Sequence, residues 1–220
     1  MLWRSTKSSK KEFERKAAAA AGEGLKTMKF VQTAMERACN VKLIIFDVDG
    51  VLTDGNIHLS ERGEVFKSFS VQDGLGIGMA RKAGMKTAII TGRKSKIVEF
   101  RANELKIDEL YQGKQNKLDA FAAIQKRFQV KAEEIAYIGD DFLDLPILAR
   151  VGFAAAVGNA VTEVKERAHF ISDRKGGDGA VRQIMEFLLK AQGRWEEMVN
   201  SYLDLEVTDE RVKEIENIEQ

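Results

Sequence analysis

The sequence predicts an α/β fold, a Rossmann-like doubly wound parallel sheet with helices on both faces and a small β-hairpin flap. Three observations support this fold. Residues 42–48, 86–92 and 133–141 contain continuous apolar runs, as expected for strands buried on both faces. Segments with helical periodicity separate these strands, which is the order expected for a parallel sheet. Residues 56–60 and 65–71 flank the sequence ERGE, whose Gly63 indicates a hairpin turn.

The other elements follow along the chain. Helical patterns cover residues 73–84, 94–105, 115–128, 143–150, 160–167 and 179–192. Short strands are predicted at 107–113, 152–157 and 169–171. We therefore expect one domain over residues 41–193. A basic N-terminal extension, residues 1–40, is predicted to be partly helical or disordered, and residues 194–220 form an acidic C-terminal tail.

Composition limits the classes of function. The chain has 220 residues, 44% hydrophobic and 31% charged, with a net charge of +1, as in ordinary globular proteins. Residues 1–40 carry nine Lys and Arg against four Glu, and residues 194–220 carry three against nine acids. The central domain is thus nearly neutral, which argues against nucleic-acid binding. Cys39 is the only cysteine, and no apolar run could span a membrane, so we expect a cytoplasmic protein.

Reactive side chains follow the predicted central strands. The first strand ends in Asp47 and Asp49, the second in Thr91, and the third in Asp140 and Asp141; Asp144 lies one turn later. Ligands of open α/β sheets bind outside the carboxyl ends of the strands, so these groups should meet there. Several carboxylates at one edge repel one another unless a cation binds, and oxygen ligands of this kind suit Mg²⁺. Two histidines and one cysteine argue against a zinc cage or a Ser-His-Asp triad.

The spacing of Asp47 and Asp49 favours phosphoryl transfer. On an extended segment, residues two apart face the same way. One carboxylate can attack phosphorus while the other handles the proton of the leaving oxygen. Thr91 can hydrogen-bond a phosphoryl oxygen, and Lys117, at the start of a helix, can offset its negative charge together with the metal.

Three local motifs suggest other chemistry, and each fails. DVDGVLTDG resembles a calcium loop, but Val51 and Leu52 stand where an EF-hand needs an acid and a glycine. DGLGIGMA does not match the dinucleotide pattern G-x-G-x-x-G, and GKQNK has no Ser or Thr after the lysine of a P-loop. A plain turn after a strand would explain Asp47 and Asp49 alone, but not ITGR, Lys117 and GDDFLD following in this order.

These elements resemble the four motifs of the haloacid dehalogenase superfamily of phosphatases, over residues 42–194. DVDGVLTDG is similar to the first motif, IITGR to the second, Lys117 to the third and GDDFLD to the fourth. The resemblance implies that Asp47 is the nucleophile and Asp49 the general acid and base. It also implies that Asp47, the Asp49 main-chain carbonyl and Asp140 hold Mg²⁺, supported by Asp141 and Asp144. By the same resemblance, an acid at position 49 implies a phosphatase.

The gaps between these motifs leave no room for a cap domain, since each holds only small elements. Among capless members, the chain resembles the family of 3-deoxy-D-manno-octulosonate 8-phosphate phosphatases. That likeness implies a phosphorylated sugar acid as substrate and a homotetramer formed through the hairpins. We expect Ile57, Leu59, Phe66 and Phe69 to be exposed on the hairpin. The likeness places substrate-binding residues at Asp49, Ser70, Val71, Gln72, Asp73, Gly74, Gly92, Arg93, Arg101 and Lys117.

Arg93 and Arg101, expected about two turns apart on one helix, could grip the carboxylate of an acidic sugar. The chain departs from the family at three positions that often carry arginine: Gln72, Gly78 and Asp178. A nine-carbon substrate such as N-acylneuraminate 9-phosphate therefore stays open. A further alternative is a non-catalytic assembly domain of the same fold, but such a scaffold has no need of both Asp47 and Asp49. The segment 174–179 has three glycines, and we expect it to be mobile without ligand.

Overall fold

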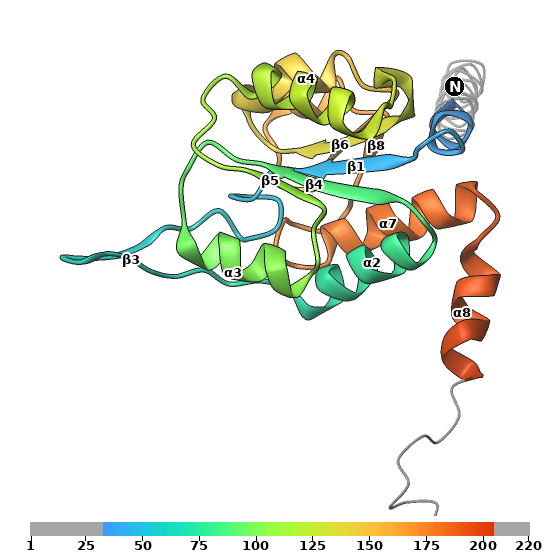
Figure 1. Cartoon of the computed structure of the whole chain (residues 1–220), viewed down its shortest axis with the longest axis horizontal. Helices are drawn as coiled ribbons and strands as arrows, with labels where there is room; N and C mark the ends of the chain where they lie inside the picture. Colours follow the sequence, from blue (N-terminus) through green and yellow to red (C-terminus); the bar gives the residue numbers. More distant parts are fainter. Residues whose placement is uncertain (1–32, 205–220) are drawn as a thin grey trace, which may run out of the picture.

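A six-stranded parallel sheet forms the centre of the computed structural model, which describes residues 33–204 (Figure 1). The strand order is β5-β4-β1-β6-β7-β8. The strands are β1 (Leu43–Phe46), β4 (Lys86–Ile90), β5 (Glu109–Tyr111), β6 (Ile135–Gly139), β7 (Phe153–Ala156) and β8 (Phe170–Ile171). β1 pairs in parallel with both β4 and β6, so the carboxyl ends of these three strands lie side by side.

Helices cover both faces of this sheet, as the doubly wound fold requires. In Figure 1, α4 lies on one face, whereas α2, α3 and α7 lie on the other. The longer helices are α2 (Val71–Lys82), α3 (Lys96–Glu104), α4 (Lys117–Phe128), α7 (Ala180–Ala191) and α8 (Trp195–Leu203). Short helical turns are η1 (Ala132–Glu134), η2 (Phe142–Asp144), α5 (Leu145–Leu148) and α6 (Thr162–Lys165). The segments between the four motifs contain no cap domain, which confirms the predicted fold class.

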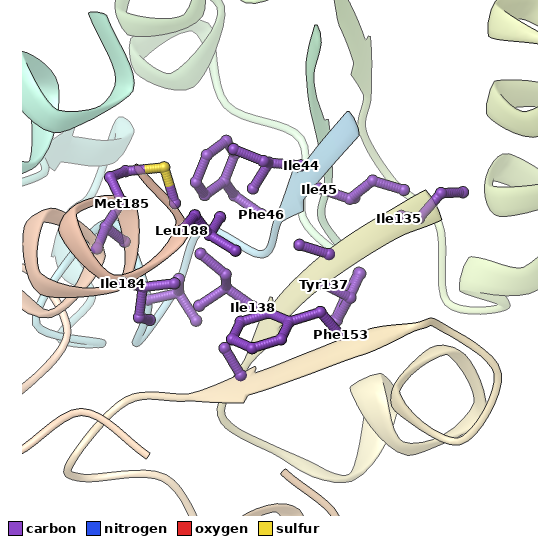
Figure 2. Close-up of a cluster of buried hydrophobic side chains, with 14 of the residues drawn as sticks. Ile44, Ile45, Phe46, Ile135, Tyr137, Ile138, Phe153, Ile184, Met185 and Leu188 are labelled. Atoms are coloured by element: carbon purple, nitrogen blue, oxygen red, sulfur yellow. The ribbon is translucent and has the colours of Figure 1, made fainter. Parts of the chain in front are cut away.

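The core lies between the sheet and α7 on one side and the sheet and α4 on the other. Figure 2 shows Ile184 and Leu188 of α7 pointing toward the strand residues Phe46 and Ile138, and all four are fully buried. Because side chains alternate along a strand, Tyr137 points to the opposite face, where its hydroxyl meets Lys117 of α4. The central strands are therefore buried on both faces, which explains their uninterrupted apolar sequences.

The hairpin is shorter than the sequence predicts. β2 (His58–Ser60) and β3 (Gly63–Phe66) form a separate two-stranded sheet that projects from the domain (Figure 1). The predicted strand over 65–71 is wrong beyond Phe66, because Ser70 caps α2 by accepting a hydrogen bond from the Asp73 N–H. α2 thus begins at residue 71 instead of 73. Phe69 is half-buried against the core, so the expectation that it is exposed is also wrong.

Both ends of the described chain pack on the domain. Residues 33–38 are helical, and Ala34 and Ala38 are buried. α8 packs on α7 and buries Met198. The predicted boundaries at residues 40 and 194 stay predictions, and what the sequence predicts for residues 1–32 and 205–220 lies outside the described residues. Within residues 33–204, none of the helices combines the length and apolar character that crossing a membrane requires.

Candidate active site

The loop that follows β1 carries the first two acids of the site. Asp47 is buried, and Asp49 is half-buried two residues later. Thr53 holds the loop, because its hydroxyl accepts from the Gly50 and Gly55 N–H groups and donates to the Val48 carbonyl. Gly50 has a φ of 91°, and a Cβ there would lie 2.0 Å from Asp140 Oδ2. Glycine is therefore required for the loop to approach the end of β6.

Lys117 forms ion pairs with both Asp47 and Asp144. It is the first residue of α4, where Asn116 caps the helix, and its side chain is 2% exposed. Its Nζ lies 2.9 Å from Asp47 Oδ1 and 2.6 Å from Asp144 Oδ1. The Tyr137 hydroxyl donates to the same Asp144 oxygen at 2.6 Å. Burial would lower the pKa of Lys117, but the two carboxylates raise it above its ordinary value, so the ammonium is charged.

Asp140 has a side-chain oxygen at the site without a hydrogen-bond partner within residues 33–204. Its Oδ1 is buried and has no hydrogen-bond partner among the described residues. One carboxylate oxygen from each of Asp47, Asp140 and Asp144 lies within 4.8 Å of the others. Asp144 is already occupied, since its Oδ2 accepts from the Asp140 and Asp141 N–H groups. Asp47 and Asp140 therefore fit a direct role in holding a hard cation such as Mg²⁺, and Asp144 fits the supporting role predicted for it.

The pKa values of Asp47 and Asp140 also favour a cation at this site. Burial, and then the Asp144 carboxylate, raise the pKa of Asp47 to about 7 against the pull of Lys117. Burial and the neighbouring Asp47 and Asp144 carboxylates raise the pKa of Asp140 to about 8. Each acid therefore resists ionisation until a positive charge offsets the burial and the mutual repulsion. The donor set of oxygen atoms fits a divalent cation.

These groups surround a cavity of about 190 Å³ at the carboxyl ends of β1, β4 and β6. Nine of the predicted site residues line it: Asp47, Asp49, Thr91, Gly92, Arg93, Lys117, Asp140, Asp141 and Asp144. Gln115 and Leu143, which the sequence did not suggest, also line it. A larger hollow of about 860 Å³ lies at the opposite edge, by Lys42 and Lys86 at the starts of β1 and β4. It is remote from the acids, so we assign the chemistry to the smaller cavity.

The predicted substrate loop does not reach this cavity. Ser70, Val71, Gln72, Asp73 and Gly74 form the N-terminal end of α2 and are absent from the lining residues. Asp73 is buried and accepts from the main-chain N–H groups of Gly179 and Arg182. Its carboxylate therefore caps the N-terminal end of α7. Gln72 instead lines a separate hollow of about 320 Å³ with Arg174 and Arg182. Substrate contact by this loop stays a prediction.

The two arginines have different surroundings. Arg93 lines the cavity and its Nε lies 4.0 Å from Asp49 Oδ2. Arg101 lies outside it, on α3, where it donates to the Ser70 carbonyl and stacks over the Phe69 ring at 5.5 Å. The expectation that both lie on one helix is wrong, because Ser95 caps α3 and Arg93 precedes it. Arg101 Nε is buried without a hydrogen-bond partner in the described part of the chain.

The glycine segment 174–179 is held in place by the structure. The Gly176 N–H donates to Asn159 Oδ1 and the Gly177 N–H donates to the Val51 carbonyl. A Cβ on Gly176 would lie 1.7 Å from the Gly50 carbonyl oxygen. This glycine thus permits close contact with the loop after β1, and the expected mobility of the segment is not what its contacts indicate.

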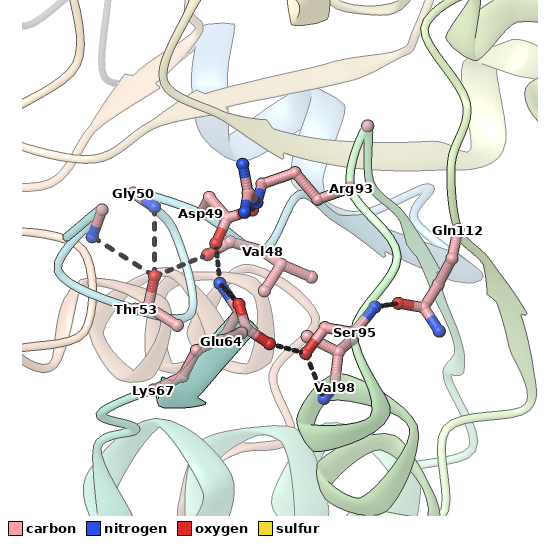
Figure 3. Close-up of polar contacts among 12 residues, drawn as sticks. Val48, Asp49, Gly50, Thr53, Glu64, Lys67, Arg93, Ser95, Val98 and Gln112 are labelled. Carbon is pink, nitrogen blue, oxygen red and sulfur yellow. Dashed lines mark hydrogen bonds and ion pairs between the residues drawn. The ribbon is translucent and has the colours of Figure 1, made fainter. Parts of the chain in front are cut away.

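The sequence alone did not indicate three residues near the site, Glu64 and Lys67 of the hairpin region and Tyr137 of β6. Lys67 pairs with Asp49 and with Glu64, and Figure 3 shows this cluster beside Arg93 and Ser95. Lys67 is among the buried residues although it follows an exposed strand. A lysine in an otherwise alternating stretch, KSFSV, carried no local sign of burial. Tyr137 lies within the apolar run of β6, where no local pattern marks its hydroxyl as a partner of Asp144.

Comparison with known proteins decides the family. Residues 95–184 match the model of haloacid dehalogenase-like hydrolases. The 3-deoxy-D-manno-octulosonate 8-phosphate phosphatase of Yersinia pestis is 44% identical over 162 residues, which cover 74% of this chain and 87% of the relative. The corresponding protein of Escherichia coli K12 is 45% identical over 73% of this chain and 86% of the relative.

The chain belongs to this phosphatase family. Membership makes it a phosphoric monoester hydrolase and fits the acids of the cavity. A solved structure agrees: the family member from Moraxella catarrhalis, crystallised with magnesium, phosphate and the sugar acid, aligns with a TM-score of 0.75 at 38% identity. That alignment covers 77% of this chain and 97% of the other. The roles of individual residues stay predictions in this family member.

Proposed function

We propose that this chain is a Mg²⁺-dependent phosphatase that hydrolyses 3-deoxy-D-manno-octulosonate 8-phosphate to the free sugar acid and phosphate. The observation that carries the proposal is the cavity where β1, β4 and β6 end, because it gathers Asp47, Thr91, Lys117 and Asp140. The names of the relatives and the ligands of the Moraxella catarrhalis structure support the sugar-acid substrate. Cys39 as the only cysteine supports a cytoplasmic location.

Two carboxylates divide the covalent chemistry. An oxygen of Asp47 attacks phosphorus, and the bond from phosphorus to the sugar oxygen breaks with its electron pair going to that oxygen. Asp49 gives its proton to the leaving oxygen, so the sugar departs as an alcohol. Water then attacks the phosphorus of the aspartyl phosphate while Asp49 takes a proton from it. Phosphate leaves and the Asp47 carboxylate is restored, which balances the cycle.

Other groups stabilise the charge on the transferred phosphoryl group. Lys117 is fixed by Asp47 and Asp144, so its ammonium faces the attacking carboxylate without having to reorganise. Thr91 lines the cavity and can donate its hydroxyl to a phosphoryl oxygen. Asp47, the Asp49 main-chain carbonyl and Asp140 would hold Mg²⁺, with Asp141 and Asp144 in support. When bound, the ion neutralises negative charge on the phosphoryl oxygens.

Recognition of the sugar rests on the rim of the cavity. Arg93 is partly exposed there and can pair with the substrate carboxylate. We assign Gly92, Arg101 and residues 70–74 to substrate binding on the likeness to the family. Gly92 lines the cavity, whereas Arg101 and residues 70–74 lie outside its lining.

A panel of phosphate esters tests the proposal. Phosphate release is measured for 3-deoxy-D-manno-octulosonate 8-phosphate, N-acylneuraminate 9-phosphate and glucose 6-phosphate, each with Mg²⁺ and with chelator. We expect the highest kcat/KM for the eight-carbon acid, a low value for glucose 6-phosphate and no turnover with chelator. A higher kcat/KM for the nine-carbon acid would select the alternative substrate. Absence of turnover with every ester would leave the non-catalytic alternative.

A further inference from the structure

The base of the hairpin reaches the active site of its own subunit. β3 ends at Phe66, and the next residue, Lys67, turns back into the domain, where its side chain is 1% exposed. Lys67 and Lys117 are the two buried lysines among the described residues. The proposed reaction uses Lys117 but gives Lys67 no role, although Lys67 contacts one of the two acids that perform the chemistry.

Lys67 holds one oxygen of Asp49. Its Nζ is in direct contact with Asp49 Oδ1 and lies 3.1 Å from Glu64 Oε1. The other oxygen of Asp49, Oδ2, faces Arg93 Nε at 4.0 Å. The Asp49 carboxylate is therefore fixed on one side by a buried ammonium and bordered on the other by a guanidinium. An ammonium out of water needs such partners, so the contact constrains both residues.

Glu64 connects this pair to the rest of the site. Its Oε2 accepts a hydrogen bond from the Ser95 hydroxyl, whose oxygen also caps α3 by accepting from the Val98 N–H. The Ser95 N–H in turn donates to Gln112 Oε1 at 2.8 Å. Figure 3 shows the resulting chain of contacts, from the loop after β5 through Ser95 and Glu64 to Lys67 and Asp49. The hairpin is thereby anchored to the helix that follows Thr91 and Arg93.

We propose that Lys67 is a positioning residue that orients Asp49 toward the leaving oxygen of the substrate, with Glu64 and Ser95 holding Lys67 in place. This inference rests on the proposed function and extends it. Proton transfer requires the Asp49 carboxyl group to lie within hydrogen-bond reach of the leaving oxygen, and a carboxyl group that is free to rotate spends less time there. The hairpin is then part of the catalytic machinery of its own subunit, in addition to any contact with a partner.

A double-mutant cycle tests the inference. The variants are Lys67→Met, Asp49→Asn and their combination, and kcat/KM is measured because it reports the step in which the leaving group departs. Two substrates are compared. The sugar-acid phosphate releases an alkoxide that needs a proton, whereas p-nitrophenyl phosphate releases a phenolate that needs little assistance.

Lys67→Met should lower kcat/KM for the sugar-acid phosphate at least about 10-fold, a part of the 10²–10⁴ that general acid catalysis contributes. For p-nitrophenyl phosphate the loss should stay under about 3-fold. In the Asp49→Asn background the same substitution should change kcat/KM by less than about 2-fold, because residues that act through one another are not additive.

Three results would overturn the inference while leaving the phosphatase intact. These are an equal loss on both substrates, an undiminished loss in the Asp49→Asn background, or no loss at all. The first two would mean that Lys67 contacts the substrate or supports the fold by itself. If the wild-type protein hydrolysed no phosphate ester, the proposed function would fail and this inference with it.

Two further variants keep the test decisive. Lys86→Met is the matched control, because Lys86 also forms an ion pair, with Asp108 at 3.2 Å, but at the far end of β4. It should leave both substrates unaffected. If Lys67→Met does not fold, as judged by thermal unfolding, Glu64→Gln takes its place. Glu64→Gln keeps Lys67 and weakens one of its two contacts. It should lower kcat/KM for the sugar-acid phosphate less than Lys67→Met does, and it should again affect p-nitrophenyl phosphate little. In the Asp49→Asn background this effect of Glu64→Gln should disappear.

Discussion

Nζ of Lys117 lies 2.9 Å from Oδ1 of Asp47. The same ammonium lies 2.6 Å from Asp144, so a single buried cation is shared by two carboxylates, while Asp140 Oδ1 has no hydrogen-bond partner among residues 33–204. The site thus holds more negative than positive charge. This imbalance explains why oxygen atoms of Asp47 and Asp140 suit a divalent cation, and it leads to predictions about pH, metal and individual residues.

Metal-free protein should become less stable as pH rises from about 4 to 8 because of the site acids. Asp47 and Asp140 have folded pKa values of about 7 and 8, above their ordinary value of 3.8. An acid with a raised folded pKa stabilises the fold while protonated, and this contribution is lost as pH rises through the folded pKa. Mg²⁺ requires the ionised acids, so the increase in Tm that it causes should grow from pH 6 to pH 8.

Thermal unfolding at several pH values, with Mg²⁺ and with chelator, measures both effects. Asp140→Asn is the control, since it keeps the shape of the side chain but cannot ionise. It should flatten the pH dependence of the metal-free protein and reduce the increase with Mg²⁺. A Mg²⁺-dependent increase in Tm that is the same at pH 6 and pH 8 would contradict the assignment of these acids.

Asp47→Asn and Asp49→Asn should fail at different steps. Asp47→Asn removes the nucleophile, and turnover should fall below about a tenth of the wild-type value with no covalent phosphate on the protein. Asp49→Asn should lose roughly 10²–10⁴ in rate on the sugar-acid phosphate. With p-nitrophenyl phosphate, Asp49→Asn should accumulate the aspartyl phosphate, because no base activates water. Mass spectrometry after acid quench detects that adduct, and its presence in Asp47→Asn would falsify the nucleophile assignment.

Gly50→Ala should disrupt the metal site. A Cβ at this position would lie 2.0 Å from Asp140 Oδ2, and the backbone has a φ of 91°. Gly84→Ala is a matched control, since Gly84 has a φ of 86° but nothing within 4 Å of the added atom. Both should lose about 1–2 kcal/mol of stability from the left-handed conformation. Gly50→Ala alone should lose activity and the Mg²⁺-dependent increase in Tm, and equal behaviour of the two would sink the prediction.

Arg93→Ala and Arg101→Ala should separate recognition from stability. Arg93 borders the cavity, so its loss should raise KM for the sugar-acid phosphate by about 10-fold and hardly affect p-nitrophenyl phosphate. Arg101 holds the Ser70 carbonyl and stacks on Phe69, so its loss should also lower stability, by about 1–3 kcal/mol. Denaturant unfolding and steady-state kinetics on both substrates measure the two effects. If Arg93→Ala affected both substrates equally, the arginine would serve phosphate binding.

The hairpin should join copies of this chain in a homotetramer. Ile57, Leu59, Val65 and Phe66 are 45–66% exposed on it, more apolar surface than a two-stranded ribbon can cover. Phe142 and Leu143 are also about half exposed beside the cavity, where a partner could close the capless site. Light scattering should give about four times the monomer mass of 24.6 kDa. Leu59→Glu should shift that mass toward the monomer, and a wild-type monomer at micromolar concentration would refute the prediction.

Local patterns in the sequence were enough to predict the sheet and the centre of the site. The apolar runs ending at Asp47, Thr91 and Asp140 identify parallel strands, and parallel strands bring their carboxyl ends to one edge. Lys117 is predicted because it stands at the start of the helix that precedes the third strand. Where side-chain hydrogen bonds compete with extended structure, local reading failed, as at Ser70, which starts α2 two residues early.

Only the tertiary structure decided which polar side chains pair across long distances in the sequence. Asp73 was predicted to bind substrate, yet its carboxylate caps a helix whose first residues lie more than a hundred positions away. Lys67 is hydrophilic by type and follows an exposed strand, but the path of the hairpin brings it to Asp49 and buries it. The apolar periodicity of a segment shows which face of that segment is buried, because apolar residues repeat with the period of the helix or strand they belong to. Which distant polar groups pair depends on how the elements pack, and no local pattern encodes that choice.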